Sequence, residues 1–195
     1  GHPVNRRRAG AGKKEATSVW LWGQGGKPAM EPLSEKYGLR GGMISAVDLL
    51  NGLAVYAGLE ILRVEGATGY IDTNFAGKAE KALEALERKD FVFVHVEAPD
   101  EMGHEGNAPG KVKAIEDFDG KVVGPVLEGI ARYGEHRVLV LSDHPTPVAK
   151  KTHTAEPSPF AVLSSRPGDN VKGAAAFSEE EAVAGRIVVS PGWQL

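Results

Sequence analysis

Short segments that are apolar at nearly every position mark the strands of this chain. The segments 91–96 and 137–142 are rich in Val, Leu and Phe, which is typical of strands buried on both faces of a parallel sheet. We expect two further strands, at 160–163 and 61–64, because each is a short apolar run. Another apolar run, at 19–22, contains two Trp and ends in a glycine-rich loop, so it predicts a further buried strand.

Apolar residues with helical spacing lie between these strands. The spacing predicts helices over about 45–57, 77–89 and 111–132, and it is clearest at 77–89, where small and apolar residues line one face and charged residues the other. The pair Gly124-Pro125 is expected to kink or split the third helix, because Pro lacks a backbone N–H. This alternation predicts an α/β fold with a mostly parallel β-sheet flanked by helices.

Composition narrows the classes of protein that fit. The 195 residues are 42% hydrophobic and 25% charged, which favours one folded domain over a disordered chain. The chain has no Cys, so a disulfide scaffold, a thiolate zinc site and a Cys nucleophile are excluded, and any metal site must use His, Asp and Glu. Residues 1–18 are basic and rich in small residues, so we expect an exposed or linker segment there.

Charge and the length of the apolar runs argue against two kinds of partner. The formal net charge is −3, which gives no electrostatic basis for binding nucleic acid. No apolar run reaches the roughly 18 residues that a membrane span needs, so no membrane partner is expected. The three Arg at 6–8 are not followed by an apolar stretch, so no signal peptide is predicted. We therefore expect a cytoplasmic protein.

Five side chains of the kind that bind metals lie at one edge of the predicted sheet. Asp100 and His104 follow the first buried strand, Asp143 and His144 follow the next, and His153 comes just before the third. A lone His at a strand end is usually a surface residue, and a lone Asp there usually caps a helix. Five together favour a metal site that takes Mn²⁺, Zn²⁺, Fe²⁺ or Co²⁺ rather than Ca²⁺. Adjacent side chains such as Asp143 and His144 point in different directions, so they could serve two ions.

Several segments carry a resemblance to a known family. They are 2–5 (HPVN), 66–74 (GATGYIDTN), 98–106 (APDEMGHEG), 142–147 (SDHPTP) and 152–154 (THT). In this order they resemble the cofactor-independent, or 2,3-bisphosphoglycerate-independent, phosphoglycerate mutases of the archaeal-type branch. The three metal segments are specific for the wider alkaline phosphatase superfamily, and the surrounding residues select the mutase branch. The resemblance covers nearly the whole chain.

The resemblance implies an alkaline-phosphatase-like fold that holds two divalent metal ions and no organic cofactor. Mn²⁺ is favoured over Zn²⁺ or Co²⁺. Asp100, His104 and His153 are expected to hold one ion, and Asp143 and His144 the other. In the family the second ion also takes an Asp from the first strand and the nucleophilic Ser, and this sequence has neither in a matching context. We therefore expect residues 1–195 to be the C-terminal portion of the metal-binding domain, with a sheet that lacks its N-terminal strand segment.

The family's reaction implies the substrate and the further partner of this chain. The mutases interconvert 3- and 2-phosphoglycerate, in glycolysis and gluconeogenesis, through a phosphoserine. The implied substrate is thus a small phosphorylated three-carbon acid. Because the nucleophilic Ser is absent, we assign no catalytic residue here. We expect the chain to bind one ion well and the other poorly, and to be inactive without the missing N-terminal segment.

Cationic side chains are needed to bind the anionic groups of such a substrate. The candidates are Lys36, whose Glu-Lys-Tyr context is similar to one in the family, and Arg7 and Arg8, which also fit a solvated basic segment. His95 lies within a predicted strand, and we interpret it as a packed, hydrogen-bonded core residue.

Two other functions fit the same metal residues. The first is a metal-dependent phosphatase, or a phosphotransferase acting on a small alcohol, as in a homoserine-kinase-like enzyme. The second is a non-catalytic metal-binding module that docks on a partner.

Overall fold

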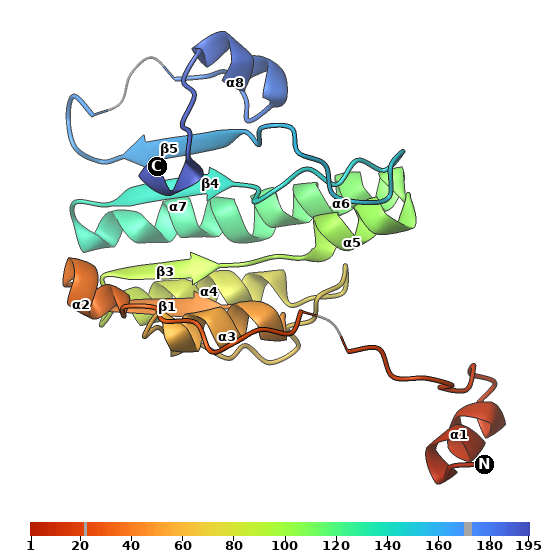
Figure 1. Cartoon of the computed structure of the whole chain (residues 1–195). Helices are drawn as coiled ribbons and strands as arrows, with labels where there is room; N and C mark the ends of the chain where they lie inside the picture. Colours follow the sequence, from red (N-terminus) through yellow and green to blue (C-terminus); the bar gives the residue numbers. More distant parts are fainter. Residues whose placement is uncertain (22, 170–172) are drawn as a thin grey trace.

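The strands form two separate sheets. The computed structural model describes residues 1–21, 23–169 and 173–195. In the first sheet, β1 (Gly41–Ile44) lies between β2 (Glu60–Ile61) and β3 (Phe91–Val94), and both pairings are parallel. In the second, β4 (Arg137–Leu141) pairs with β5 (Phe160–Ser164) in antiparallel fashion. Figure 1 shows β1, β3 and β4 with their carboxyl ends on the same side of the molecule.

Helices connect and cover these strands (Figure 1). The helical elements are α1 (Pro3–Gly10), α2 (Leu33–Tyr37), α3 (Asp48–Tyr56), α4 (Phe75–Leu86), α5 (Ala98–Glu105), α6 (Ala108–Phe118), α7 (Gly124–Ile130) and α8 (Glu179–Gly185). A π-helical segment, η1 (Asp119–Val123), joins α6 to α7, and two 3₁₀ turns are η2 (Ala131–Tyr133) and η3 (Gly192–Gln194). None of the helices in the described ranges is long and apolar enough to cross a bilayer.

The helix α4 forms the core against β1 and β3. Its buried stripe includes Phe75, Ala79, Ala82 and Ala85, at the spacing that places residues on one helix face. Asn74 begins the helix, because its side-chain oxygen accepts a hydrogen bond from the Gly77 N–H at 2.9 Å. The amphipathic pattern at 77–89 therefore predicted this helix correctly, apart from its first turn and its end.

The central strand β1 is an element that the apolar pattern did not predict. Its first two residues are glycines, which usually indicate a turn, yet all four residues are buried. A side chain at Gly41 would overlap the Phe91 ring, and one at Gly42 would lie 2.5 Å from Leu62. Glycine is therefore used here for close packing between strands.

Several predicted strands differ from the observed ones. The run at 19–22 is not a buried strand in its described part, because Val19, Trp20 and Leu21 are 83–86% exposed and no strand pairs with them; residue 22 lies outside the described residues. The predicted strand at 61–64 is reduced to β2. Phe93 is 48% exposed, so β3 is open on one face. The strands β4 and β5 also have exposed positions, because they form only a two-stranded pair.

The long helix predicted over 111–132 is split, as the Gly124-Pro125 pair indicated. The backbone changes from α-helix to π-helix over Asp119–Val123, directly before Gly124. Pro125 cannot donate a backbone hydrogen bond, and such interruptions often take the form of a π-bulge.

A slot separates the two sheets. Between β3 and β4 lies a cavity of about 420 Å³, and no backbone pairing joins these strands. Apolar residues such as Val92, Val122 and Val140 line it together with charged ones such as Asp90 and Arg137. The strand edges that face this slot have no strand partner among the described residues.

Candidate metal centre

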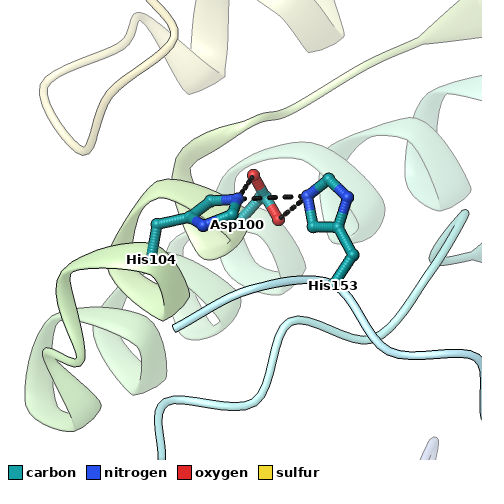
Figure 2. Close-up of side chains that lie close together, drawn as sticks. All are labelled: Asp100, His104 and His153. Carbon is teal, nitrogen blue, oxygen red and sulfur yellow. Dashed lines mark hydrogen bonds and ion pairs between the residues drawn. The ribbon is translucent and has the colours of Figure 1, made fainter. Parts of the chain in front are cut away.

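Asp100, His104 and His153 converge on one point. Asp100 and His104 lie one turn apart on α5, so they share a helix face, and His153 reaches them from the loop between β4 and β5 (Figure 2). The Nε2 atom of His104 is 3.2 Å from Asp100 Oδ2 and 3.1 Å from His153 Nε2, which is 3.4 Å from Asp100 Oδ1. One ligand atom from each residue lies within 4.8 Å of the others, so the trio has the geometry of a cation site.

The tautomer of His104 supports this interpretation. Its Nδ1 lies 3.1 Å from the carbonyl oxygen of Lys151, which can only accept a hydrogen bond, so Nδ1 carries the proton. In the neutral ring Nε2 then carries its lone pair on the side that faces Asp100 and His153 Nε2. This backbone contact is the kind that orients metal-bound histidines in proteins. Imidazole nitrogens and a carboxylate together suit Mn²⁺, Zn²⁺, Fe²⁺ or Co²⁺.

Asp143 and His144 lie beside the trio. The His144 and His153 rings pack together with centroids 3.7 Å apart. The Thr146 hydroxyl donates its one proton to Asp100 Oδ1. In its contact with His144 Nδ1, at 3.2 Å, Thr146 Oγ1 must therefore be the acceptor, so Nδ1 carries the proton. The lone pair of His144 Nε2 is then 3.4 Å from Asp143 Oδ2. The pair therefore offers two ligand atoms of its own next to the first site.

We call the region that holds these five residues the metal edge. It lies at the carboxyl ends of β3 and β4, where open α/β sheets bind ligands. Asp100 is largely buried, whereas the Asp143 side chain is 74% exposed. Thr146 and the Lys151 carbonyl were not predicted as parts of this region. Thr146 lies within the 142–147 motif, but no sequence signal marks a backbone carbonyl.

The predicted substrate-binding cations lie away from the metal edge. Lys36 is on α2, near the amino ends of the strands, and its Nζ lies 5.1 Å from the centre of the Tyr37 ring. Arg7 and Arg8 lie on α1, which stands apart from the sheets in Figure 1 and has no buried residue. The predicted exposed segment at 1–18 is exposed in the structure and begins with this helix. The structure does not bring these three residues together.

A second polar group lies at the ends of β1 and β3. His95 contacts Ser45 through Nδ1 at 3.3 Å and Glu97 through Nε2 at 3.2 Å, in agreement with the interpretation of His95 as a packed, hydrogen-bonded residue. Burial lowers the pKa of His95 and raises the pKa of Glu97. No sequence signal marked Ser45 or Glu97 as part of this group.

Known proteins similar to this chain were found by sequence and by structure. A probable 2,3-bisphosphoglycerate-independent phosphoglycerate mutase from Geobacter sulfurreducens is 53% identical over 194 residues, which are 100% of this chain and 48% of that protein. The 2,3-bisphosphoglycerate-independent phosphoglycerate mutase of Methanosarcina barkeri is 52% identical over 95% of this chain and 47% of its own length. The chain thus spans about half the length of the curated relatives it matches.

Two solved structures resemble the fold. The PH0037 protein from Pyrococcus horikoshii aligns with a TM-score of 0.72 and 29% identity over 81% of this chain and 46% of its own. The cofactor-independent phosphoglycerate mutase from Thermoplasma acidophilum aligns over 96% of this chain and 43% of its own, with a TM-score of 0.59 and 24% identity, which supports the fold alone. Residues 6–185 match the Metalloenzyme superfamily. The chain belongs to the Metalloenzyme superfamily.

Proposed function

We propose that this chain is the metal-holding part of a cofactor-independent phosphoglycerate mutase, which interconverts 3- and 2-phosphoglycerate. The observation that carries the proposal is the convergence of Asp100, His104 and His153 in a chain that is about half identical to proteins named as such mutases. The substrate is then a small phosphorylated three-carbon acid. We place the reaction in glycolysis and gluconeogenesis, and the protein in the cytoplasm.

We propose that the metal edge takes two divalent ions, with Mn²⁺ as the native metal. Asp100, His104 and His153 hold one ion, and Asp143 and His144 contribute to the other. Bound ions of this kind neutralise charge on a transferring phosphoryl group. The chain's own residues fix the ligands: the Lys151 carbonyl orients His104, and Thr146 orients Asp100 and His144.

The remaining half of the mutase supplies the other parts in this proposal. It brings the nucleophilic Ser, the further Asp for the second ion and a strand that enters the slot between β3 and β4. The slot has unpaired strand edges on both sides, and apolar residues of β3, α7 and β4 in its walls could cover an inserted strand. A strand parallel to β3 would end at the metal edge. We therefore expect the isolated chain to bind metal without isomerising phosphoglycerate.

A coupled assay on the full-length parent mutase tests the proposal. With Mn²⁺ supplied, we expect conversion of 3- to 2-phosphoglycerate, and we expect His153→Ala to abolish it. The exposed His2 gives a matched control, and His2→Ala should keep the activity. Release of inorganic phosphate without isomerisation would instead support the metal-dependent phosphatase or small-alcohol phosphotransferase, and metal binding with no reaction would support a non-catalytic module.

The cations proposed to bind the substrate are Lys36, Arg7 and Arg8. Their distance from the metal edge means that they could act only if the missing half brings the substrate's anionic groups to them. An increase in KM for Lys36→Ala in the full-length mutase, compared with Lys27→Ala, would support this role. An unchanged KM would exclude it for Lys36.

A further inference from the structure

One lysine is buried behind the metal edge. Lys78 lies on α4 and is 1% exposed, although the other buried residues of that helix are apolar or small. Its Nζ donates to the carbonyl oxygen of His95 at 2.9 Å, and this is the one hydrogen bond recorded for its side chain among the described residues. An ammonium group buried with so few partners is unfavourable for folding.

The electrostatics of Lys78 agree with that geometry. Burial lowers the pKa of Lys78 to about 8, against the opposing attraction of Glu97. The ammonium therefore stays largely protonated at pH 7 while it costs stability. Groups that reduce stability in this way are concentrated at functional sites.

The contacts of Lys78 lead to the helix that carries the metal ligands. His95 follows β3, and α5 begins at Ala98. The carboxylate of Glu97 can only accept a hydrogen bond, so His95 Nε2 carries the proton, and Ser45 Oγ donates to His95 Nδ1. Ser45 is itself held by the Val47 N–H at 3.0 Å. The His95 ring is thereby held between the Ser45 hydroxyl and the Glu97 carboxylate.

Glu97 connects this network to Asp100. The carbonyl oxygen of Glu97 accepts hydrogen bonds from the Asp100 N–H at 2.8 Å and the Glu101 N–H at 3.2 Å, which form the first turn of α5. The position of the Glu97 backbone thus determines the position of Asp100 in the first turn of α5. Its side chain lies among other acidic groups, since Asp100, Glu101 and Asp143 all act on it electrostatically. The charge of Glu97 in turn attracts the buried ammonium of Lys78 and raises its pKa.

We propose that Lys78 is a positioning residue of the metal edge, which holds Glu97 and His95 so that α5 presents Asp100 to the metal ion. This inference rests on the metal binding proposed above. In this role Lys78 lowers the stability of the folded chain and raises its affinity for the metal ion. A purely structural role would instead make Lys78 raise the stability.

Titration of the 195-residue chain with Mn²⁺, beside thermal unfolding of the metal-free chain, tests the proposal. In Lys78→Met an apolar group of similar length replaces the ammonium. We expect Mn²⁺ affinity to fall about 10- to 100-fold, the range for residues that orient metal ligands. We expect the unfolding temperature to stay within about 4 °C of wild type or to rise. The matched control is Lys81→Met, in the next turn of α4, where Lys81 pairs with Glu84 at the surface.

A second variant and a double variant keep the proposal falsifiable if Lys78→Met does not fold. Glu97→Gln keeps an acceptor for His95 and removes the charge that attracts Lys78, and it should weaken Mn²⁺ binding to a similar degree. Because Lys78 acts through Glu97, the double variant should bind Mn²⁺ about as well as either single variant. The visible spectrum of the Co²⁺-loaded chain should change in both single variants and not in Lys81→Met.

Two results would overturn the inference. One is wild-type Mn²⁺ affinity in Lys78→Met or Glu97→Gln, and the other is loss of affinity only in step with loss of folding. If the wild-type chain itself fails to bind Mn²⁺, the proposed metal centre is contradicted together with the role of Lys78. The wild-type titration alone distinguishes this outcome from the two above.

Discussion

At the scale of single residues, the metal edge is defined by where protons can lie. The Lys151 carbonyl fixes the proton of His104 on Nδ1, and Thr146 fixes that of His144 on Nδ1. The Nε2 lone pairs of both rings therefore face carboxylate oxygens, of Asp100 and Asp143 respectively, at 3.2 and 3.4 Å. When both rings are neutral, acceptors face acceptors and repel unless a cation lies between them, so this geometry suits a bound metal ion.

Thr146 offers a test at this scale. Thr146→Val keeps the shape of a residue that is 4% exposed but removes the hydroxyl that bridges Asp100 and His144. We expect Mn²⁺ affinity to fall about 10- to 100-fold, as measured by titration calorimetry. Thr17→Val, in the exposed N-terminal segment, is the control. Unchanged affinity in Thr146→Val would show that the hydroxyl does not orient the ligands.

A surface ion pair gives a prediction for pH. Arg88 and Lys89 hold Glu60 at 2.6 and 2.8 Å and lower the pKa of Glu60 to about 2. A carboxyl whose pKa is lowered by folding stabilises the chain above its unfolded value of about 4.5, and this contribution is lost as pH falls towards 2. Urea unfolding should find Glu60→Gln less stable than wild type at pH 6, with the difference shrinking as pH is lowered from 4.5 towards 2. An equal difference at both ends of this range would contradict the assignment.

At the scale of elements, the sequence predicted those that depend on local pattern and missed one that depends on long-range packing. The sequence predicted α4 and the split helix α6–α7, because helical spacing and Pro125 act locally. It missed β1, because Gly41 and Gly42 favour a turn and only the packing of Phe91 and Leu62 explains them. The Trp-containing run at 19–22 looked like a strand, but an apolar run forms one only where a sheet edge is available.

Two glycines with opposite surroundings test the packing of β1. A Cβ at Gly41 would overlap Phe91, so Gly41→Ala should lower the free energy of unfolding by about 1–3 kcal/mol. A Cβ at Gly52, within α3, meets no atom within 4 Å, so Gly52→Ala should raise it by about 0.5–1 kcal/mol. Urea unfolding measures both. The same sign for both substitutions would contradict the packing described for β1.

At the scale of the whole molecule, the two sheets are separated by a slot that the sequence could not place. The i, i+4 spacing of Asp100 and His104 was readable from the chain, and so was the approach of His153 to the same edge. The pairing of β4 with β5 was not, because strand pairing depends on contacts between residues distant in sequence. The incomplete sheet agrees with a chain that covers 48% of its Geobacter relative.

In the proposed function the slot takes a strand from the rest of a mutase, and this predicts that such a half binds the chain. Co-expression with the part of the Geobacter sulfurreducens mutase that this chain does not cover should give a complex with a raised unfolding temperature. Val140→Asp, in the slot wall, should prevent copurification, whereas Val162→Asp, at a half-exposed position of β5, should not. Equal copurification of both variants would place the interface elsewhere.

The most direct test of the central claim is the metal content of the purified 195-residue chain, measured after saturation with Mn²⁺ and removal of loosely bound ions. The wild-type chain should retain about one ion, held by Asp100, His104 and His153. His104→Ala should lose it, and His2→Ala, in the exposed N-terminal segment, should keep it. Equal metal content in wild type and His104→Ala would contradict the metal centre.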